Sequence, residues 1–132
     1  MAATLAKLYV EQLFAEKNLN DIYWAISVVE KDRELPDEFW LFSRVYEWAP
    51  SRSGVWQYYE GLSAERFKRV SEGLDRFGLV EIAKHYRLGQ RSWDGPTQAA
   101  EVDDWLDVHT AEIHSAVFRL IADKWNCLTD PS

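Results

Sequence analysis

The sequence predicts an all-α fold, a compact single-domain bundle of about six to seven helices that covers residues 1–132. Three observations support this prediction. Apolar residues recur at i, i+3, i+4 and i+7 along most of the chain, patterns that alternate at every second residue are scarce, and capping residues separate the apolar stretches. A chain of 132 residues is also long enough to bury a hydrophobic core.

The first part of the chain divides into three expected helices. Residues 3–17 carry one apolar stripe, and Asn20 is the expected N-cap of a second helix over about 20–31. Pro36 fits the first turn of a third helix because its ring fixes a helical φ where no amide hydrogen is needed. Pro50 is expected to end that helix.

The central stretch 52–61 is crowded with aromatic side chains, and we expect it to contain one or two helical turns. Ser63 is the expected N-cap of the next helix, and Gly78 stands where a helix commonly ends in the left-handed conformation. A further helix is predicted over 79–89. Residues 90–98 are predicted to form a long loop, because turn-forming residues cluster there.

The last and longest helix is predicted over about 100–125. The helical spacing also predicts the core. Its expected members are Trp56, Phe67, Leu74, Ile82, Ile113, Val117 and Leu120.

The net charge of −7 is distributed unevenly along the chain. Residues 1–51 contain nine acids and five bases, residues 52–91 contain five acids and eight bases, and residues 101–132 contain seven acids and two bases. An acidic total argues against direct nucleic-acid binding, because phosphate groups need a positive field.

Composition also predicts where the protein acts. No stretch approaches the ~20 apolar residues of a membrane span, and the N-terminus lacks the basic and apolar regions of a signal peptide. Cys127 is the only cysteine, so no intrachain disulfide can form. We therefore expect a cytoplasmic protein without membrane association.

The strongest charge feature is a run of carboxylates on the last predicted helix. Glu101, Asp103, Asp104 and Asp107 are accompanied by Glu112 and contain no Lys or Arg among them. Residues three or four apart on a helix have Cβ atoms about 5–6 Å apart, a spacing close to the repeat of charge along a nucleic-acid strand. The four carboxylates are therefore predicted to bind a basic partner. The alternative is that they only favour the positive helix end and keep the surface solvated.

Other residue patterns indicate no chemistry. His85, His109 and His114 lack the spacing of a metal site, the six glycines form no phosphate-binding loop, and no nucleophile motif is present. The sequence thus predicts no catalytic residue, no metal and no cofactor.

The segment from Gly54 to Tyr59 resembles the signature of a widespread bacterial domain of unknown function that includes DNA-mimic proteins. Gly54, Gln57, Tyr58 and Tyr59 match that signature, and Gly78 resembles its later glycine step. The resemblance covers roughly residues 36–125. It implies a helical fold in which these five residues form a structural motif, and a DNA-mimic role for some members.

Three functions remain open from the sequence. The first is an acidic protein-interaction module, such as a DNA mimic or an inhibitor of a basic or nucleic-acid-binding protein. The second is a small enzyme with a pocket near Gln57, Tyr58, Tyr59 and His85. The third is a non-catalytic structural module, including a homodimer formed through an exposed Trp93 or Trp105.

Overall fold

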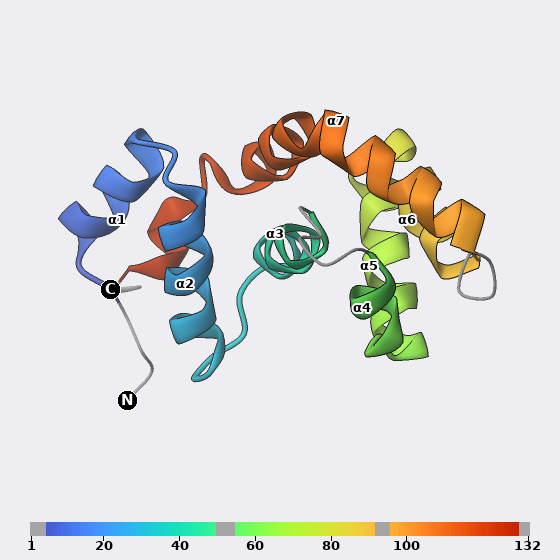
Figure 1. The fold of residues 1–132 in the computed structure, drawn as a ribbon. Helices are drawn as coiled ribbons and strands as arrows, with labels where there is room; N and C mark the ends of the chain where they lie inside the picture. Colours follow the sequence, from blue (N-terminus) through green and yellow to red (C-terminus); the bar gives the residue numbers. More distant parts are fainter. Residues whose placement is uncertain (1–4, 50–54, 92–95, 130–132) are drawn as a thin grey trace. The chain divides into compact units, whose positions relative to one another are not determined.

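The computed structural model describes residues 5–49, 55–91 and 96–129, with side chains described for 5–49, 58–89 and 100–129. These residues form an all-α fold (Figure 1), which confirms the predicted fold class. The described residues form no β-strand; Leu5 and Thr129 make an isolated parallel bridge. The helices are α1 (Lys7–Ala15), α2 (Leu19–Glu30), α3 (Asp37–Trp48), α4 (Val55–Glu60), α5 (Ala64–Arg76), α6 (Val80–Arg91) and α7 (Pro96–Ile121), followed by the 3-10 helix η2 (Trp125–Leu128).

The chain divides into two compact units, and the division falls inside α3 and inside α7. Unit 1 comprises residues 1–43 and 115–132, and unit 2 comprises residues 44–114. The prediction of one domain over 1–132 stays a prediction.

Unit 1 is built on the pair α1 and α2, against both of which η2 packs. The rings of Phe14 and Phe118 lie 5.8 Å apart between centroids. Two polar links support the same unit: Arg33 donates a hydrogen bond to the Cys127 carbonyl, and Lys124 pairs with Glu38 at 3.5 Å. The buried apolar residues of α1 and α2 are Val10, Leu13, Phe14, Ile22, Ala25, Ile26 and Val29.

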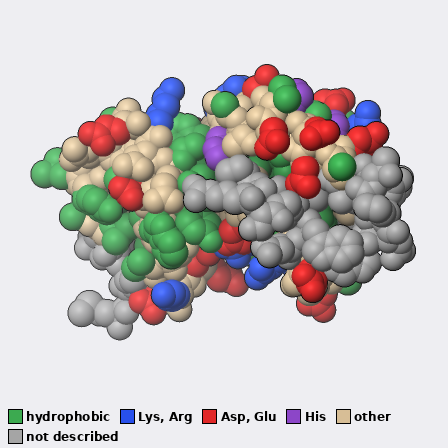
Figure 2. Space-filling view, viewed as in Figure 1, with side chains coloured by type: hydrophobic (Ala, Val, Ile, Leu, Met, Phe, Trp, Pro, Cys, Tyr) green, Lys and Arg blue, Asp and Glu red, His purple; other side chains and the backbone are tan. Residues whose placement is uncertain are grey.

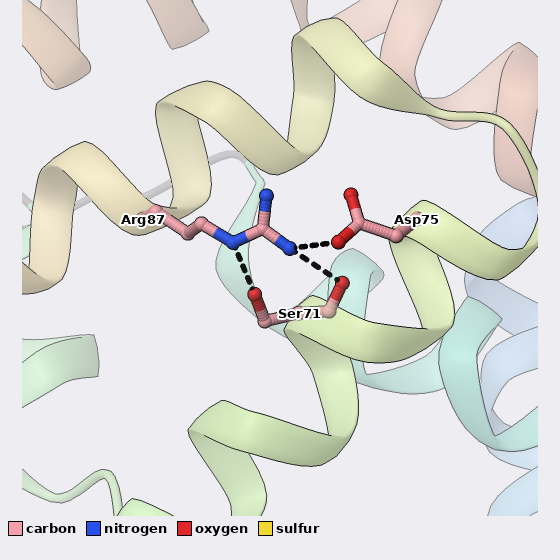
Figure 3. Close-up of polar contacts among 3 residues, drawn as sticks. All are labelled: Ser71, Asp75 and Arg87. Carbon is pink, nitrogen blue, oxygen red and sulfur yellow. Dashed lines mark hydrogen bonds and ion pairs between the residues drawn. The ribbon is translucent and has the colours of Figure 1, made fainter.

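Unit 2 is organised around α6, which packs against α5 and α4. Arg87 of α6 makes three polar contacts with Ser71 and Asp75 of α5 (Figure 3). Its Nε donates to Ser71 Oγ at 2.5 Å, its Nη2 donates to the Ser71 carbonyl at 3.2 Å, and the same nitrogen pairs with Asp75. The fixed fork of a guanidinium suits such multiple acceptors.

Local capping signals are confirmed at two of the predicted positions. The Ser63 hydroxyl accepts a hydrogen bond from the Arg66 amide at 3.1 Å and so caps α5. Gly78 follows the end of α5 with φ of +76°, a conformation that glycine adopts without steric cost. The Leu79 amide then closes the turn by donating to the Leu74 carbonyl at 2.8 Å.

The prediction of Asn20 as an N-cap is wrong. Asn18 caps α2 instead: its side chain accepts from the Asp21 amide at 3.3 Å and donates to the Asp21 carboxylate at 2.9 Å. The cause lies one residue earlier, where Lys17 adopts a left-handed φ of +53° and turns the chain early. Pro36 directly precedes α3, and its carbonyl accepts a hydrogen bond from the Phe39 amide at 3.0 Å.

The boundaries near the C-terminal end also differ from the prediction. α6 continues to Arg91 and α7 begins at Pro96, so the expected loop over 90–98 is shorter than predicted. α7 ends at Ile121 rather than near residue 125, and η2 follows.

Most of the predicted core is confirmed. Leu74, Ile82, Ile113 and Val117 are buried. Phe67 and Leu120 are only partly buried. The Trp56 side chain lies outside the described part of the structure.

Candidate functional site

α7 presents a row of exposed carboxylates, and these are the strongest candidates for a functional surface. Glu101, Asp104, Asp107 and Glu112 are all exposed. With 3.6 residues per turn they fall within an arc of about 140° around the helix axis. We call these four residues the acidic face. Opposite them on α7 lie buried apolar residues, namely Val102, Leu106, Ile113 and Val117.

Basic side chains are missing from the sequence around the acidic face. Residues 92–118 contain no Lys or Arg, and Arg119 is the first base after Arg91. Among the described residues, no ion pair involves any member of the acidic face. Figure 2 shows acidic side chains gathered over α7. The charges are therefore left to solvent in the free protein.

Asp103 is less exposed than the other three predicted carboxylates. It was expected to share the binding surface with Glu101, Asp104 and Asp107, but it is only half-exposed and has an interaction of its own. Asp103 lies just outside the arc of the acidic face. It is two residues after Glu101, so the two side chains point to nearly opposite sides of the helix. The acidic face consequently gains Glu112 and loses Asp103.

A stack of three rings ties α7 to α6 beside the acidic face. The Trp105 ring stacks with two histidines, at 3.8 Å and 6° from His85 of α6 and at 4.7 Å and 20° from His109. Both imidazoles are fixed by Nδ1, which bonds the Glu81 carbonyl in His85 at 2.9 Å and the Trp105 carbonyl in His109 at 2.8 Å. Because a carbonyl oxygen only accepts, each Nδ1 carries the hydrogen.

The stack of His85 on Trp105 joins α6 to α7 within unit 2. The expected exposure of Trp105 is not found, because that side chain is half-buried and stacks with His85 and His109. A homodimer through Trp105 stays a prediction. Trp93, the other candidate, lies outside the described residues.

His114 has a separate role within unit 2. Its Nε2 donates to the Ala49 carbonyl at 2.6 Å, immediately after the end of α3, and its ring lies 5.0 Å from that of Tyr46. The histidine thereby satisfies one of the carbonyl groups that a helix end leaves without an internal partner. Across the described part of the chain, no three His, Cys, Asp or Glu side chains come together in a group that would hold a metal ion.

Tyr58, Tyr59 and Tyr86 form a cluster that joins α4 to α6. The Tyr58 and Tyr86 hydroxyls share a hydrogen bond of 2.6 Å, and the Tyr59 hydroxyl donates to the Tyr86 carbonyl at 2.6 Å. Trp48 and Phe67 close the cluster, with ring centroids 5.2 Å and 5.5 Å from that of Tyr86.

Burial keeps the hydroxyls of this cluster protonated. It raises the pKa of Tyr58 to about 12, and burial together with the neighbouring Tyr58 raises the pKa values of Tyr59 and Tyr86 further. Hydroxyls with such raised pKa values give up their protons less readily than an ordinary tyrosine does. The cluster thus acts as a packed, hydrogen-bonded joint between two helices.

The motif residues suggested by the resemblance are only partly described. Tyr58, Tyr59 and Gly78 have the structural roles given above, whereas Gly54 and the Gln57 side chain lie outside the described residues. Sequence reasoning missed the His85–Trp105–His109 stack, because helical spacing relates only residues of one helix. The sequence signal that bears on it is the four-residue spacing of Trp105 and His109.

No described helix is long and apolar enough to cross a membrane.

Comparison with models of protein families, with curated proteins and with solved structures finds no match for this chain. The resemblance to the family that includes DNA mimics therefore stays an expectation from a few residues. The geometry of the chain itself is the basis for assigning a function.

Proposed function

We propose that this chain is a protein-interaction module whose acidic face binds a basic surface on another protein. The observation that carries the proposal is the combination of four exposed carboxylates on one helix with the absence of Lys and Arg from residues 92–118. Carboxylates that form no ion pair with a base of their own chain can attract and orient a basic partner before contact.

The kind of partner follows from the spacing of the charges. Neighbouring carboxylates on the acidic face lie three to five residues apart, and those three or four apart are separated by about 5–6 Å at Cβ. A protein that binds nucleic acid carries basic side chains arranged to meet a repeating negative charge. A nucleic-acid-binding protein is thus the favoured partner, with the chain acting as a DNA mimic or inhibitor. Direct nucleic-acid binding is disfavoured by the net charge of −7.

The proposal places the protein in the cytoplasm. Its single cysteine leaves it independent of disulfide formation, which suits a reducing compartment.

The test is affinity capture from an extract of the native cell, with elution by salt. The bait is compared with a triple variant, Glu101→Gln/Asp104→Asn/Asp107→Asn, that keeps the shape of the acidic face and removes three charges. A matched control, Asp32→Asn/Glu34→Gln/Asp123→Asn, removes three charges from exposed residues of unit 1.

We expect the wild-type chain and the control to capture the same basic protein, and the triple variant to lose it. Equal capture by all three baits would refute the acidic face as the binding surface. Loss from both variants would show that only the net charge matters.

A further inference from the structure

The α1–α2 pair carries exposed apolar side chains that the fold of unit 1 does not use. The described residues include six large hydrophobic residues with exposed side chains, and four of them lie on these two helices. Leu8 is 79% exposed, Tyr9 49%, Trp24 60% and Val28 47%. Figure 2 shows hydrophobic side chains gathered over this helix pair. Apolar side chains in such a group mark interaction surfaces more often than single ones do.

Trp24 and Val28 are the two exposed apolar residues of α2, and they lie one turn apart. The buried residues of the same helix are Ile22, Ala25, Ile26 and Val29, so Trp24 and Val28 do not belong to the core. The Trp24 ring packs against Tyr23, with centroids 5.6 Å apart at 72°. Tryptophan is one of the residue types most enriched among interface anchors.

The charges on α2 are arranged so that the helix complements a second copy of itself. In an antiparallel pair centred between Trp24 and Val28, Trp24 of each copy lies opposite Val28 of the other. The same register brings Lys31 opposite Asp21. Lys31 is exposed and forms no ion pair among the described residues, and Asp21 lies in the first turn of α2. One symmetric arrangement therefore buries both apolar residues and pairs two opposite charges at each end.

The local charge permits two copies to approach. Residues 5–33 carry five acids and four bases, which is close to neutral in a chain of net charge −7. A surface of this kind escapes the repulsion that two acidic surfaces would experience.

We infer that this chain forms a symmetric homodimer in which α2 packs antiparallel to α2 of the second copy through Trp24 and Val28. This inference is independent of the acidic face and goes beyond the proposed function. Each end of the α2 pair is closed by Lys31 of one copy and Asp21 of the other.

The oligomeric state of the full chain tests the inference, measured by sedimentation equilibrium. We expect a dimer at about 100 µM, as for a dissociation constant of about 10 µM or tighter. Trp24→Lys should raise the dissociation constant at least about 10-fold, because it removes a central anchor and places two charges in the interface. The matched control is Val108→Lys on α7, which adds the same charge at a valine that is 76% exposed. It should leave the dimer intact.

A charge exchange tests the register. Lys31→Glu alone should weaken the dimer, and Asp21→Lys with Lys31→Glu should restore it, with circular dichroism confirming that each variant is folded. A wild-type chain that is monomeric at about 100 µM overturns the inference. So does a Trp24→Lys variant that dimerises like the wild type. Failure of the double exchange to restore the dimer overturns the antiparallel register.

Discussion

Gly89 lies inside α6, and the ring of Tyr59 occupies the space that a side chain at this position would need. The sequence suggested that this glycine ends the helix near residue 89. The structure instead continues the helix to Arg91 and uses the missing side chain for a close approach between α4 and α6. The Tyr59 hydroxyl reaches the Tyr86 carbonyl only because its ring can lie against Gly89.

Gly89→Ala should therefore destabilise the protein although alanine favours a helix. A Cβ at position 89 would overlap the hydroxyl end of the Tyr59 ring. Overpacking of this kind should outweigh the ~1 kcal/mol gain in helix propensity and lower the free energy of unfolding by about 1–2 kcal/mol. Urea denaturation provides the measurement. Gly61→Ala is the control, because no atom lies within 4 Å of its new Cβ. Equal stability of the two variants would contradict the close approach.

The buried tyrosines predict a loss of stability at alkaline pH. The folded state holds the Tyr58 proton up to a pKa of about 12, whereas an unfolded chain releases it near 10. The contribution of this group is thus complete below about pH 10 and is lost as the pH rises toward 12, because the unfolded state then binds fewer protons.

Urea denaturation over a series of pH values measures this effect. We expect the free energy of unfolding to fall above about pH 10 in the wild type, and to fall less steeply in Tyr58→Phe, which lacks the titrating group. Identical slopes for the two proteins would show that Tyr58 is not protected by burial.

At the scale of single elements, the sequence predicted those helix ends that depend on hydrogen bonds between residues close together in the chain. The cap at Ser63 and the left-handed Gly78 depend on hydrogen bonds three to five residues long, so local sequence suffices. Asn18 replaced Asn20 because of the backbone conformation of Lys17, which no residue preference indicates. The contacts of Tyr59 with α6, like the stack of His85 on Trp105, join different helices, so periodicity along one helix could not predict them.

The link between α5 and α6 through Arg87 and Ser71 is likewise a contact between elements. Ser71 is buried, and loss of the guanidinium would leave its hydroxyl without this donor. Arg87→Met should lower the free energy of unfolding by about 1–3 kcal/mol.

A double-mutant cycle isolates that link. Ser71→Ala should cost less in the Arg87→Met background than in the wild type, by at least about 0.5 kcal/mol. Ser115→Ala, at an exposed position of α7, is the additive control. Strict additivity of Arg87→Met and Ser71→Ala would show that the contact contributes nothing to stability.

At the scale of the whole molecule, the sequence predicted the fold class and the position of the acidic helix. The binding role of the four carboxylates stays a prediction, and Asp103 is the one that is only half-exposed. Charge is distributed unevenly between the helices. Before Arg119, α7 contains Asp and Glu but no Lys or Arg, whereas the α1–α2 pair is nearly neutral and carries exposed apolar side chains. This uneven distribution is the basis for proposing a basic partner for α7 and a second copy of the chain for α2.

The most direct test of the proposed function is the association rate of the captured partner as a function of ionic strength. Charges separated by more than about 8–10 Å are screened at physiological salt, so attraction by the acidic face should act mainly at low salt. The wild-type chain should associate fast at low salt and much more slowly at high salt, while Glu101→Gln/Asp104→Asn/Asp107→Asn should be slow at both. A triple variant that associates at the wild-type rate at low salt would contradict the account.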